Sequence, residues 1–234
     1  MSLILGIETA TKMCSVALSD GEKLLAFKEY GGDYSHAENL NGFIQEVMDQ
    51  AKVKLSDVDA IAVSKGPGSY TGLRIGVSTA KGLCYSLNKP LISVETLQAM
   101  AINPSVKNPS GEVQGNDILF CPMIDARRME VYTAIYEEGG KELVPISAKI
   151  IDENSFSDLL KTNKVVFFGD GALKCKEVLS HQPNAIFVED IEPSAQYLNQ
   201  FAFSKFVENN FEDVAYFEPF YLKDFIATTP KKLL

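Results

Sequence analysis

Residues 4–30 read ILGIETATKMCSVALSDGEKLLAFKEY, and they contain three consecutive segments with the composition of β-strands. The segments run from Ile4 to Thr9, from Cys14 to Ser19 and from Lys23 to Tyr30. Asp20-Gly21 separates the last two, and this dipeptide is typical of a tight turn between antiparallel strands. The stretch therefore predicts a three-stranded meander, and the elements on its C-terminal side decide which fold it begins.

An amphipathic helix is the next predicted element. Ser35-His36-Ala37-Glu38 has the pattern of a capping box, in which the serine and glutamate side chains bind free amide groups at a helix start. Behind it, six apolar residues recur at helical spacing, namely Leu40, Phe43, Ile44, Val47, Met48 and Ala51. Such a stripe predicts a helix with one apolar face.

Strands and helices alternate over the rest of the first half. We expect a strand at 59–64, a helix at 70–87, a strand at 91–94 and a short helix at 96–102. In letters, the first half reads βββαβαβα.

The second half repeats this order after 103–116, a segment rich in Pro, Ser, Gly and Asn that we interpret as a linker or loop. The expected strands are 118–124, 131–137, 142–151, 165–168 and 186–188, and the expected helices are 155–161, a segment after Gly171, and 194–208. A strand-like end follows around 216–222. The repetition predicts an α/β protein of two tandem ribonuclease-H-like lobes, the plan of the sugar kinase, actin and Hsp70 (ASKHA) group. We assign 1–102 to the first lobe and 103–234 to the second.

The composition is that of an ordinary globular protein, with 46% hydrophobic and 23% charged residues in 234. No apolar run approaches the roughly 20 residues that a membrane-spanning helix needs, and the first residues predict a strand and not a signal peptide. The four cysteines are scattered and form no CxxC pair, which favours reduced thiols. We expect a cytoplasmic protein that does not bind membranes.

The net charge is −9, and no useful cluster of Lys or Arg precedes Lys231-Lys232. Proteins that bind RNA by themselves usually present a basic face, because contacts to phosphates dominate the affinity. If nucleic acid is involved in the function, we therefore expect another subunit to hold it.

The most informative segment is Ser64–Gly76, SKGPGSYTGLRIG, at a predicted junction of strand and helix. Glycines there permit a tight turn, and free amides at a helix start can bind an anion. The segment is not a P-loop, since no Gly-Lys-Ser/Thr follows, and Ser69 is not framed as the nucleophile in GxSxG. Turn formation and a phosphate cradle both stay open, and turn chemistry alone explains most of the pattern.

Small residues line one face of the helix at 70–87, where Gly72, Gly76 and Ala80 are spaced by four. A line of small residues lets another helix approach closely. The helix either packs tightly on its own sheet or, together with the apolar stripe of the preceding helix, presents a surface to a partner. From the spacing we favour a partner surface.

Two carboxylates follow corresponding strands of the two halves. Glu8, with Thr9, ends the first strand, and Asp125 ends the matching strand of the second half. They would bind Mg²⁺ together if the lobes brought them across a cleft. The alternative, which we favour, is that Asp125 makes a local turn or a salt bridge with Arg127.

The chain resembles the TsaB (YeaZ) family. The similar segments are ILGIETATKMCSVALSDG, SKGPGSYTGLRIGVSTAKGL, PLISVETL, PMIDARRMEVYTA and FEPFYL, and they are densest over residues 3–135. The resemblance implies an ASKHA-type fold with a reduced second lobe. It also implies a catalytically silent paralogue of TsaD, the metal-dependent subunit that transfers threonylcarbamoyl to the adenosine beside the anticodon of tRNA.

The resemblance further implies that such a chain binds TsaD, that the complex recruits the ATPase TsaE, and that tRNA is met only through the complex. TsaD holds its metal with two histidines four residues apart. In this chain His36 occupies the first of these positions, and the residue four positions later is Leu40. We therefore expect no catalytic residue, no metal site and no cofactor, although a nucleotide at the partner interface stays open. A homodimer that TsaD displaces is expected when the chain is alone.

The implied partner surface lies on the two helices at about 36–52 and 70–87. Its expected residues are Leu40, Phe43, Ile44, Val47, Gly72, Leu73, Gly76, Val77 and Ala80. A vestigial phosphate or nucleotide cleft is the other candidate site, formed by Glu8, Thr9, Gly66, Gly68, Ser69 and Asp125.

Two other functions are compatible with parts of the sequence. An active ATPase or phosphotransferase of the same fold would need a glycine-rich adenosine loop in the second half, where Gly169-Asp170-Gly171 is the only hint. A peptidase would need a nucleophile, a base and an orienting group, and the two histidines are too far apart in sequence to supply them.

Overall fold

The computed structural model describes residues 2–32, 36–107 and 118–223. Its first sheet begins with the antiparallel meander β1 (Leu3–Glu8), β2 (Met13–Asp20) and β3 (Lys23–Gly31). β4 (Ala60–Gly66) adds in parallel to β1, and β5 (Leu91–Glu95) adds in parallel to β4. The strand order is therefore β3-β2-β1-β4-β5, as in a ribonuclease-H-like lobe.

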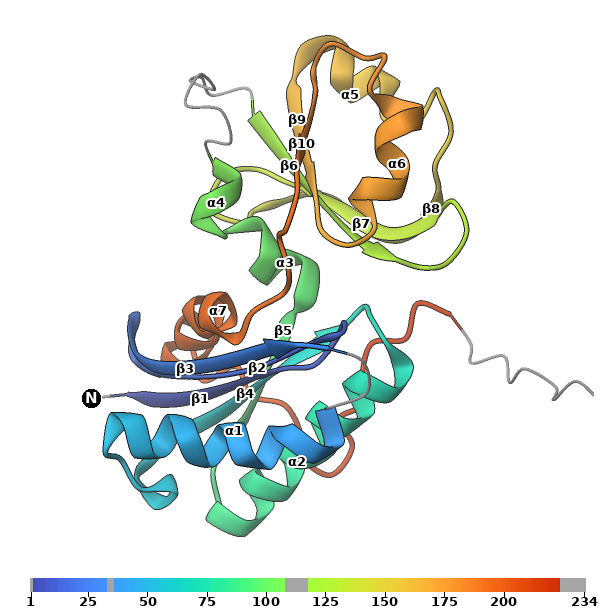
Figure 1. Ribbon diagram of the computed structural model, residues 1–234. Helices are drawn as coiled ribbons and strands as arrows, with labels where there is room; N and C mark the ends of the chain where they lie inside the picture. The colour runs from blue at the N-terminus through green and yellow to red at the C-terminus, as the bar shows by residue number, and fades with distance from the viewer. Residues whose placement is uncertain (1, 33–35, 108–117, 224–234) are drawn as a thin grey trace, which may run out of the picture.

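Helices cover both faces of this sheet (Figure 1). α1 (His36–Ala51) packs on β2 and β3, and α2 (Tyr70–Leu87) packs on β4, so the two lie side by side on one face. A short 3₁₀ turn, η1 (Leu55–Asp57), leads from α1 into β4. The opposite face is covered by α7 (Ala195–Val207), which contacts all five strands.

The second lobe repeats the topology of the first. β6 (Ile118–Asp125), β7 (Glu130–Tyr136), β8 (Glu142–Ile150), β9 (Lys164–Phe168) and β10 (Ala185–Val188) form a sheet with the order β10-β9-β6-β7-β8. Two short helices, α5 (Ser157–Thr162) and α6 (Ala172–Leu179), lie on it. The predicted fold is confirmed, and this lobe is reduced because α5 has 6 residues where α1 has 16.

One helix that follows each sheet in the chain packs against the other lobe. α3 (Thr96–Ala101) follows the last strand of the first sheet but contacts β6 and β7, and α4 (Pro104–Lys107) comes next. α7 follows the second sheet and packs on the first one. Its Asn199 is buried, and the Nδ2 atom donates to the carbonyl oxygens of Ile4 and Ala17 at 3.2 and 3.3 Å. The lobes are thus tied together by exchanged helices.

The segment after α7 departs from the sequence analysis. The predicted strand at 216–222 is wrong, because this segment forms a turn and extended coil. Phe220 N donates a hydrogen bond to Lys65 O at 2.7 Å, but no strand forms. An isolated bridge lies earlier, between Glu212 and Leu91. Pro219 has no amide hydrogen to donate, so a regular strand is disfavoured there.

Some expectations fall on residues that the structure does not describe. Ser35 of the capping box, most of the 103–116 linker and Lys231-Lys232 lie outside the described residues. In the described part, no helix is both long enough and apolar enough to span a membrane.

Candidate functional site

The end of β1 packs directly on the start of α2. Thr9 Oγ1 donates to the carbonyl oxygen of Gly72 at 2.8 Å, and Ser69 N donates to that of Ala10 at 2.6 Å. A Cβ on Gly72 would stand 2.1 Å from Thr9 O, and one on Gly76 would stand 2.3 Å from Thr9 Oγ1. Both positions require glycine because the neighbouring strand end occupies the space of a side chain.

The loop before α2 is filled in the same way. Gly66 has φ +111°, and a Cβ there would lie 2.9 Å from Phe220 O. A Cβ on Gly68 would lie 2.3 Å from Ala10 O. Ser69 caps the helix, since its Oγ accepts from Gly72 N at 3.3 Å. The glycine-rich block is therefore explained by tight packing within the chain, which is the turn interpretation of the sequence.

Glu8 is enclosed by the same strand ends. Its Oε1 accepts from Ala10 N and from Ser64 Oγ, both at 2.7 Å, and the residue is 0% exposed. Its Oε2 has no hydrogen-bond partner among the described residues. Burial raises the pKa of this carboxyl group to about 7.

Asp125 is held by its own neighbourhood at the end of β6. Its Oδ1 accepts from Arg127 N at 2.7 Å and is paired with the Lys174 ammonium group. The backbone amide of Asp125 donates to Asp170 Oδ1 at 2.9 Å. The sequence favoured such a local turn or salt bridge over a Mg²⁺ site shared with Glu8. The partner in the salt bridge is Lys174 and not Arg127.

His36 stands at the first turn of α1, where the paralogous metal ligands are expected. Its Nε2 donates to the carbonyl oxygen of Thr11 at 2.7 Å. Leu40, one turn later, is apolar and only 1% exposed. Within 2–32, 36–107 and 118–223, no three His, Cys, Asp or Glu side chains are grouped so that they could hold a metal ion. The residues present do not fit the two-histidine metal site that the resemblance assigns to TsaD.

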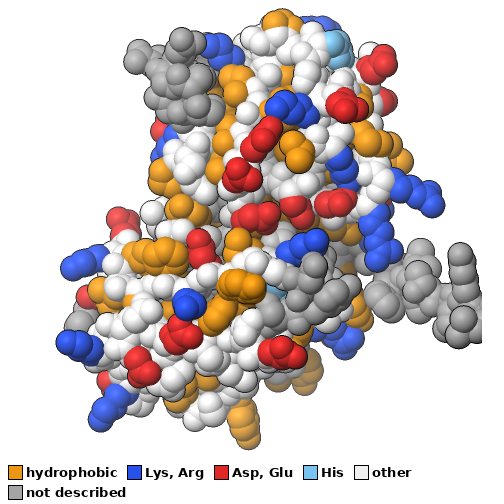
Figure 2. Space-filling view, viewed as in Figure 1, with side chains coloured by type: hydrophobic (Ala, Val, Ile, Leu, Met, Phe, Trp, Pro, Cys, Tyr) orange, Lys and Arg blue, Asp and Glu red, His pale blue; other side chains and the backbone are white. Residues whose placement is uncertain are grey.

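The boundary between the lobes is acidic, as Figure 2 shows. Burial, followed by the charge of Asp170, raises the pKa of Glu192, and burial also raises the pKa of Asp170. Thr11 Oγ1 donates to Glu192 Oε2 at 3.4 Å across the boundary. Phosphate groups placed here would meet like charge.

The apolar residues predicted to bind a partner are buried inside the lobe. Their side chains pack on the chain's own sheet, so the spacing was correctly interpreted as helical but its target was wrong. This placement corrects the expectation that they contact a partner directly. The buried set is Leu40, Phe43, Ile44, Val47, Gly72, Leu73, Gly76, Val77 and Ala80, and its side chains are at most 8% exposed.

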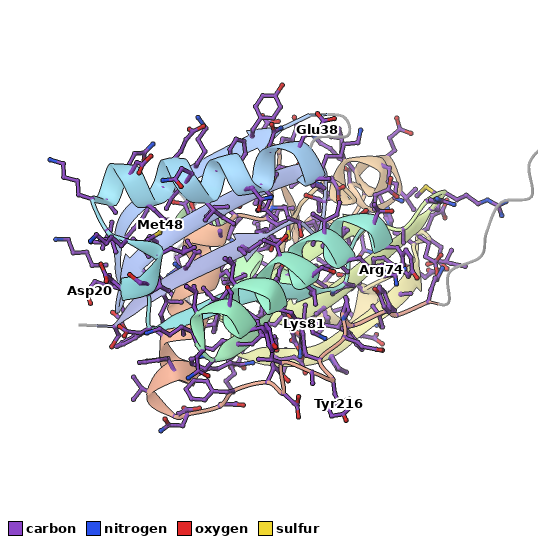
Figure 3. All side chains as sticks on the ribbon, turned by 90° about the horizontal axis from the view of Figure 1, so that it is seen from below. Asp20, Glu38, Met48, Arg74, Lys81 and Tyr216 are labelled. Atoms are coloured by element: carbon purple, nitrogen blue, oxygen red, sulfur yellow. The ribbon has the colours of Figure 1, made fainter. Side chains whose placement is uncertain are left out.

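The outer face of α1 and α2 is the part of these helices that remains available to a partner, and Figure 3 looks onto it. Gly42 in α1 and Gly82 in α2 are exposed there, and a Cβ built on either would meet nothing within 4 Å. Glycine inside a helix costs about 1 kcal/mol relative to alanine. Neither glycine has a packing role in this chain, so the open space above them is a feature to be explained. The sequence shows both glycines inside predicted helices, a signal that the apolar pattern obscured.

Charge distinguishes the two helices of this face. α1 carries Glu38, Glu46 and Asp49 and contains no Lys or Arg. α2 carries Arg74 and Lys81. A partner that covers the face would therefore need basic groups opposite α1.

The segment 209–223 runs along the other side of α2. Lys81 Nζ donates to the carbonyl oxygens of Ala215 and Phe217, and the rings of Tyr70 and Tyr221 have centroids 4.9 Å apart. No pattern in the sequence indicates this path, because periodicity does not report on irregular segments.

The chain is similar to proteins of one tRNA-modification system. Residues 28–231 match the family TsaD, tRNA N6-adenosine threonylcarbamoyltransferase. The "tRNA threonylcarbamoyladenosine biosynthesis protein TsaB" of Escherichia coli is 30% identical over 234 residues, which cover 96% of each chain. The tRNA N6-adenosine threonylcarbamoyltransferase of Sphingopyxis alaskensis is 36% identical over 126 residues, 47% of this chain and 37% of that protein. The structure of YeaZ from Pseudomonas aeruginosa aligns with a TM-score of 0.73 and 26% identity, over 95% of this chain and all of that one.

Proposed function

Since the chain belongs to the TsaD family, in its TsaB (YeaZ) branch, we propose that it is a non-catalytic scaffold subunit in the biosynthesis of threonylcarbamoyl-adenosine in tRNA. In this proposal it binds a TsaD-type paralogue, which carries out the transfer to the adenosine beside the anticodon. The observation that carries the proposal is the pair of exposed helix glycines, Gly42 and Gly82, on neighbouring helices.

Helix glycines with open space allow the backbone of another helix to come close. Residues larger than alanine would hold a partner helix away, whereas a glycine leaves its own backbone accessible. α1 and α2 lie side by side, and each presents an exposed glycine, so a partner that covers both helices can approach the backbone of each. We therefore move the proposed partner surface from the buried stripe to the outer face of the same helices. Its residues are Glu38, Asn41, Gly42, Gln45, Asp49, Thr71, Arg74, Ser78, Gly82 and Tyr85.

Several features support a role without catalysis. Glu8 is buried and bonded to its own strand ends, and Asp125 is paired with Lys174. Leu40 cannot replace a metal-binding histidine. The acidic boundary between the lobes disfavours the phosphates of a nucleotide, although a nucleotide at the interface with the partner is still compatible with the outer face.

The contact with tRNA is proposed to be indirect. A net charge of −9 and an acidic α1 oppose binding to a phosphate backbone. The paralogue would hold the tRNA, and the complex would recruit a TsaE-type ATPase. Partner binding would be centred on α1 and α2 of the first lobe, residues 1–102, with residues 103–234 as the second unit, of which α7 and the segment 209–223 pack on the first lobe.

A homodimer through the same face is proposed for the isolated chain. The self-association should be the weaker of the two, because a twofold axis near α1 would bring Glu38 and Asp49 of both copies together. The paralogue would then displace the second copy.

Light scattering after size exclusion tests the proposal. The chain is mixed with the TsaD-type paralogue of the same genome, and wild type is compared with Gly82→Glu and with the control Gly139→Glu in the second lobe; like Gly82, Gly139 has nothing within 4 Å. We expect a heteromeric mass for wild type and its loss for Gly82→Glu.

The choice of control variant depends on stability. Gly139 has φ +80°, so Gly139→Glu is used only if it keeps the wild-type melting temperature; otherwise Leu173→Glu on α6 replaces it. Absence of any complex with wild type would refute the proposal. Phe43→Glu and Val77→Glu are unsuitable, because both residues are buried in the core.

A further inference from the structure

Two tyrosines project into solvent on the α2 side of the first lobe. Tyr85 of α2 is 86% exposed and Tyr216 of the C-terminal segment is 84% exposed, more than any other large hydrophobic side chain in the described residues. Tyr85 lies one helical turn after Lys81, and the ammonium group of Lys81 holds the carbonyls on both sides of Tyr216 at 3.1 and 2.9 Å. Figure 3 shows Lys81 and Tyr216 at the same edge of α2. The two rings therefore flank one lysine, although they come from distant parts of the sequence.

The turn beneath Tyr216 is rigidly built. Asp213 Oδ1 accepts from Ala215 N at 2.8 Å and from Tyr216 N at 3.2 Å, and Phe217 N donates to Asp213 O at 2.8 Å. Val214 and Phe217, on either side, pack against the core of the first lobe. Val214 and Phe217 thus anchor the turn on the lobe, and Tyr216 is the aromatic side chain that the turn leaves exposed.

Nothing within the described chain accounts for this arrangement. A turn fixed by five hydrogen bonds, counting the two from Lys81, presents one aromatic ring to water. Tyrosine is enriched at protein interfaces because it buries a large rigid area and retains a polar end. A backbone that is already ordered also loses little further entropy on binding.

We infer that Tyr85 and Tyr216 are the two aromatic anchors of the surface that binds the TsaD-type paralogue, so that the C-terminal segment is part of that interface. This inference rests on the proposed function. Tyr85 is continuous with the proposed surface, because it lies on the outer face of α2 one turn from Gly82. The rings extend that surface beyond α2, on the side away from α1.

The charge of the surface favours the paralogue over a second copy as occupant. Glu46 of α1 is paired with Lys28 at 2.7 Å, and Glu38 and Asp49 remain as the carboxylates of α1 within the proposed surface, so a partner needs basic groups opposite these two together with apolar pockets opposite the tyrosines. The basic side chains that α2 of a second copy would supply are Arg74 and Lys81, and Lys81 is already engaged by the carbonyl oxygens of Ala215 and Phe217. The occupant is therefore a different protein with a basic rim and two apolar pockets.

Titration calorimetry with the paralogue tests the inference. Tyr85→Ala and Tyr216→Ala are compared with Leu173→Ala, which removes a side chain that is 60% exposed on α6 of the second lobe. We expect each tyrosine variant to raise Kd at least about tenfold, as anchor residues do, and the leucine variant to leave it within twofold. Lys81→Met should release the turn and raise Kd in the same direction. Melting temperatures establish that all variants are folded.

The outcomes separate this inference from the proposed function. If Gly82→Glu abolishes binding and both tyrosine variants bind as wild type does, the tyrosines are not anchors but the scaffold function stands. If only one of the two tyrosine variants raises Kd, the inference of two anchors is refuted. If the wild type binds no paralogue, the proposed function fails and the inference fails with it.

Discussion

Gly72 and Gly82 lie on the same helix in opposite environments: a Cβ on Gly72 would stand 2.1 Å from Thr9 O, whereas one on Gly82 would meet nothing within 4 Å. The first glycine is explained by the fold, because α2 could not otherwise approach β1. The second has no such explanation within the chain. The difference separates a glycine needed for folding from one that we assign to binding.

Alanine at these two positions should change stability in opposite directions. Gly82→Ala should raise the free energy of unfolding by up to about 1 kcal/mol, because alanine is the better helix former. Gly72→Ala should lower it by about 1–3 kcal/mol, since the strand end must move. Urea denaturation of both variants measures this. Equal changes would contradict the assignment of the two glycines.

Gly6 and Asn199 form a second close contact, between β1 and α7. A Cβ on Gly6 would lie 2.1 Å from Asn199 Oδ1. Asn199→Ala should cost about 2 kcal/mol, because three acceptors lose the amide group that bridges them. Gly6→Ala should cost at least about 1 kcal/mol less in the Asn199→Ala background than alone, since the clash is then removed. Additive costs in a double-mutant cycle would show that the two residues do not interact.

Glu8 should make stability depend on pH. Its pKa is raised by burial to about 7 from an ordinary 4.5, so the folded state keeps a proton that the unfolded chain releases between these values. The stabilisation is fully present below pH 4.5 and is lost as pH rises to 7, by about 3 kcal/mol. Glu8→Gln does not titrate. The unfolding free energy of wild type minus that of Glu8→Gln should therefore fall over this range, and a flat or rising difference would contradict it.

The isolated chain should not turn over ATP. Glu8 and Asp125 are held in separate local networks, so neither is available to a shared magnesium ion. Phosphate release in the presence of Mg²⁺ should be the same for wild type, Glu8→Gln and Asp125→Ala. Turnover that either substitution abolishes would favour an active phosphotransferase of the same fold.

Much of the fold was predictable because each element carries its own local signal. The helix at 70–87 was predicted with its observed bounds, and in the structure Ser69 caps its start. The strand at 216–222 was wrong because the segment is held by the ring contact of Tyr221 with Tyr70 and by the hydrogen bond from Phe220 N to Lys65 O, contacts that no local pattern encodes. The destination of α7 is likewise nonlocal, since periodicity shows a buried face but not which sheet buries it.

The candidate site was less predictable than the fold. The stripe beginning at Leu40 has the spacing of a buried face, and spacing alone cannot distinguish the chain's own sheet from a partner. The informative residues were the exceptions to the pattern, Gly42 and Gly82, because a helix interior disfavours glycine. Tyr216 could not be found from sequence, since its exposure depends on the Lys81 contacts of a distant helix.

Hydrogen exchange of the chain with and without the TsaD-type paralogue tests the central claim most directly. The paralogue should slow amide exchange in α1 (His36–Ala51) and α2 (Tyr70–Leu87) and leave α6 (Ala172–Leu179) unchanged. In the Gly82→Glu variant the slowing should disappear. Slowed exchange confined to the second lobe, or no change in α1 and α2 while a complex forms, would contradict the proposed surface.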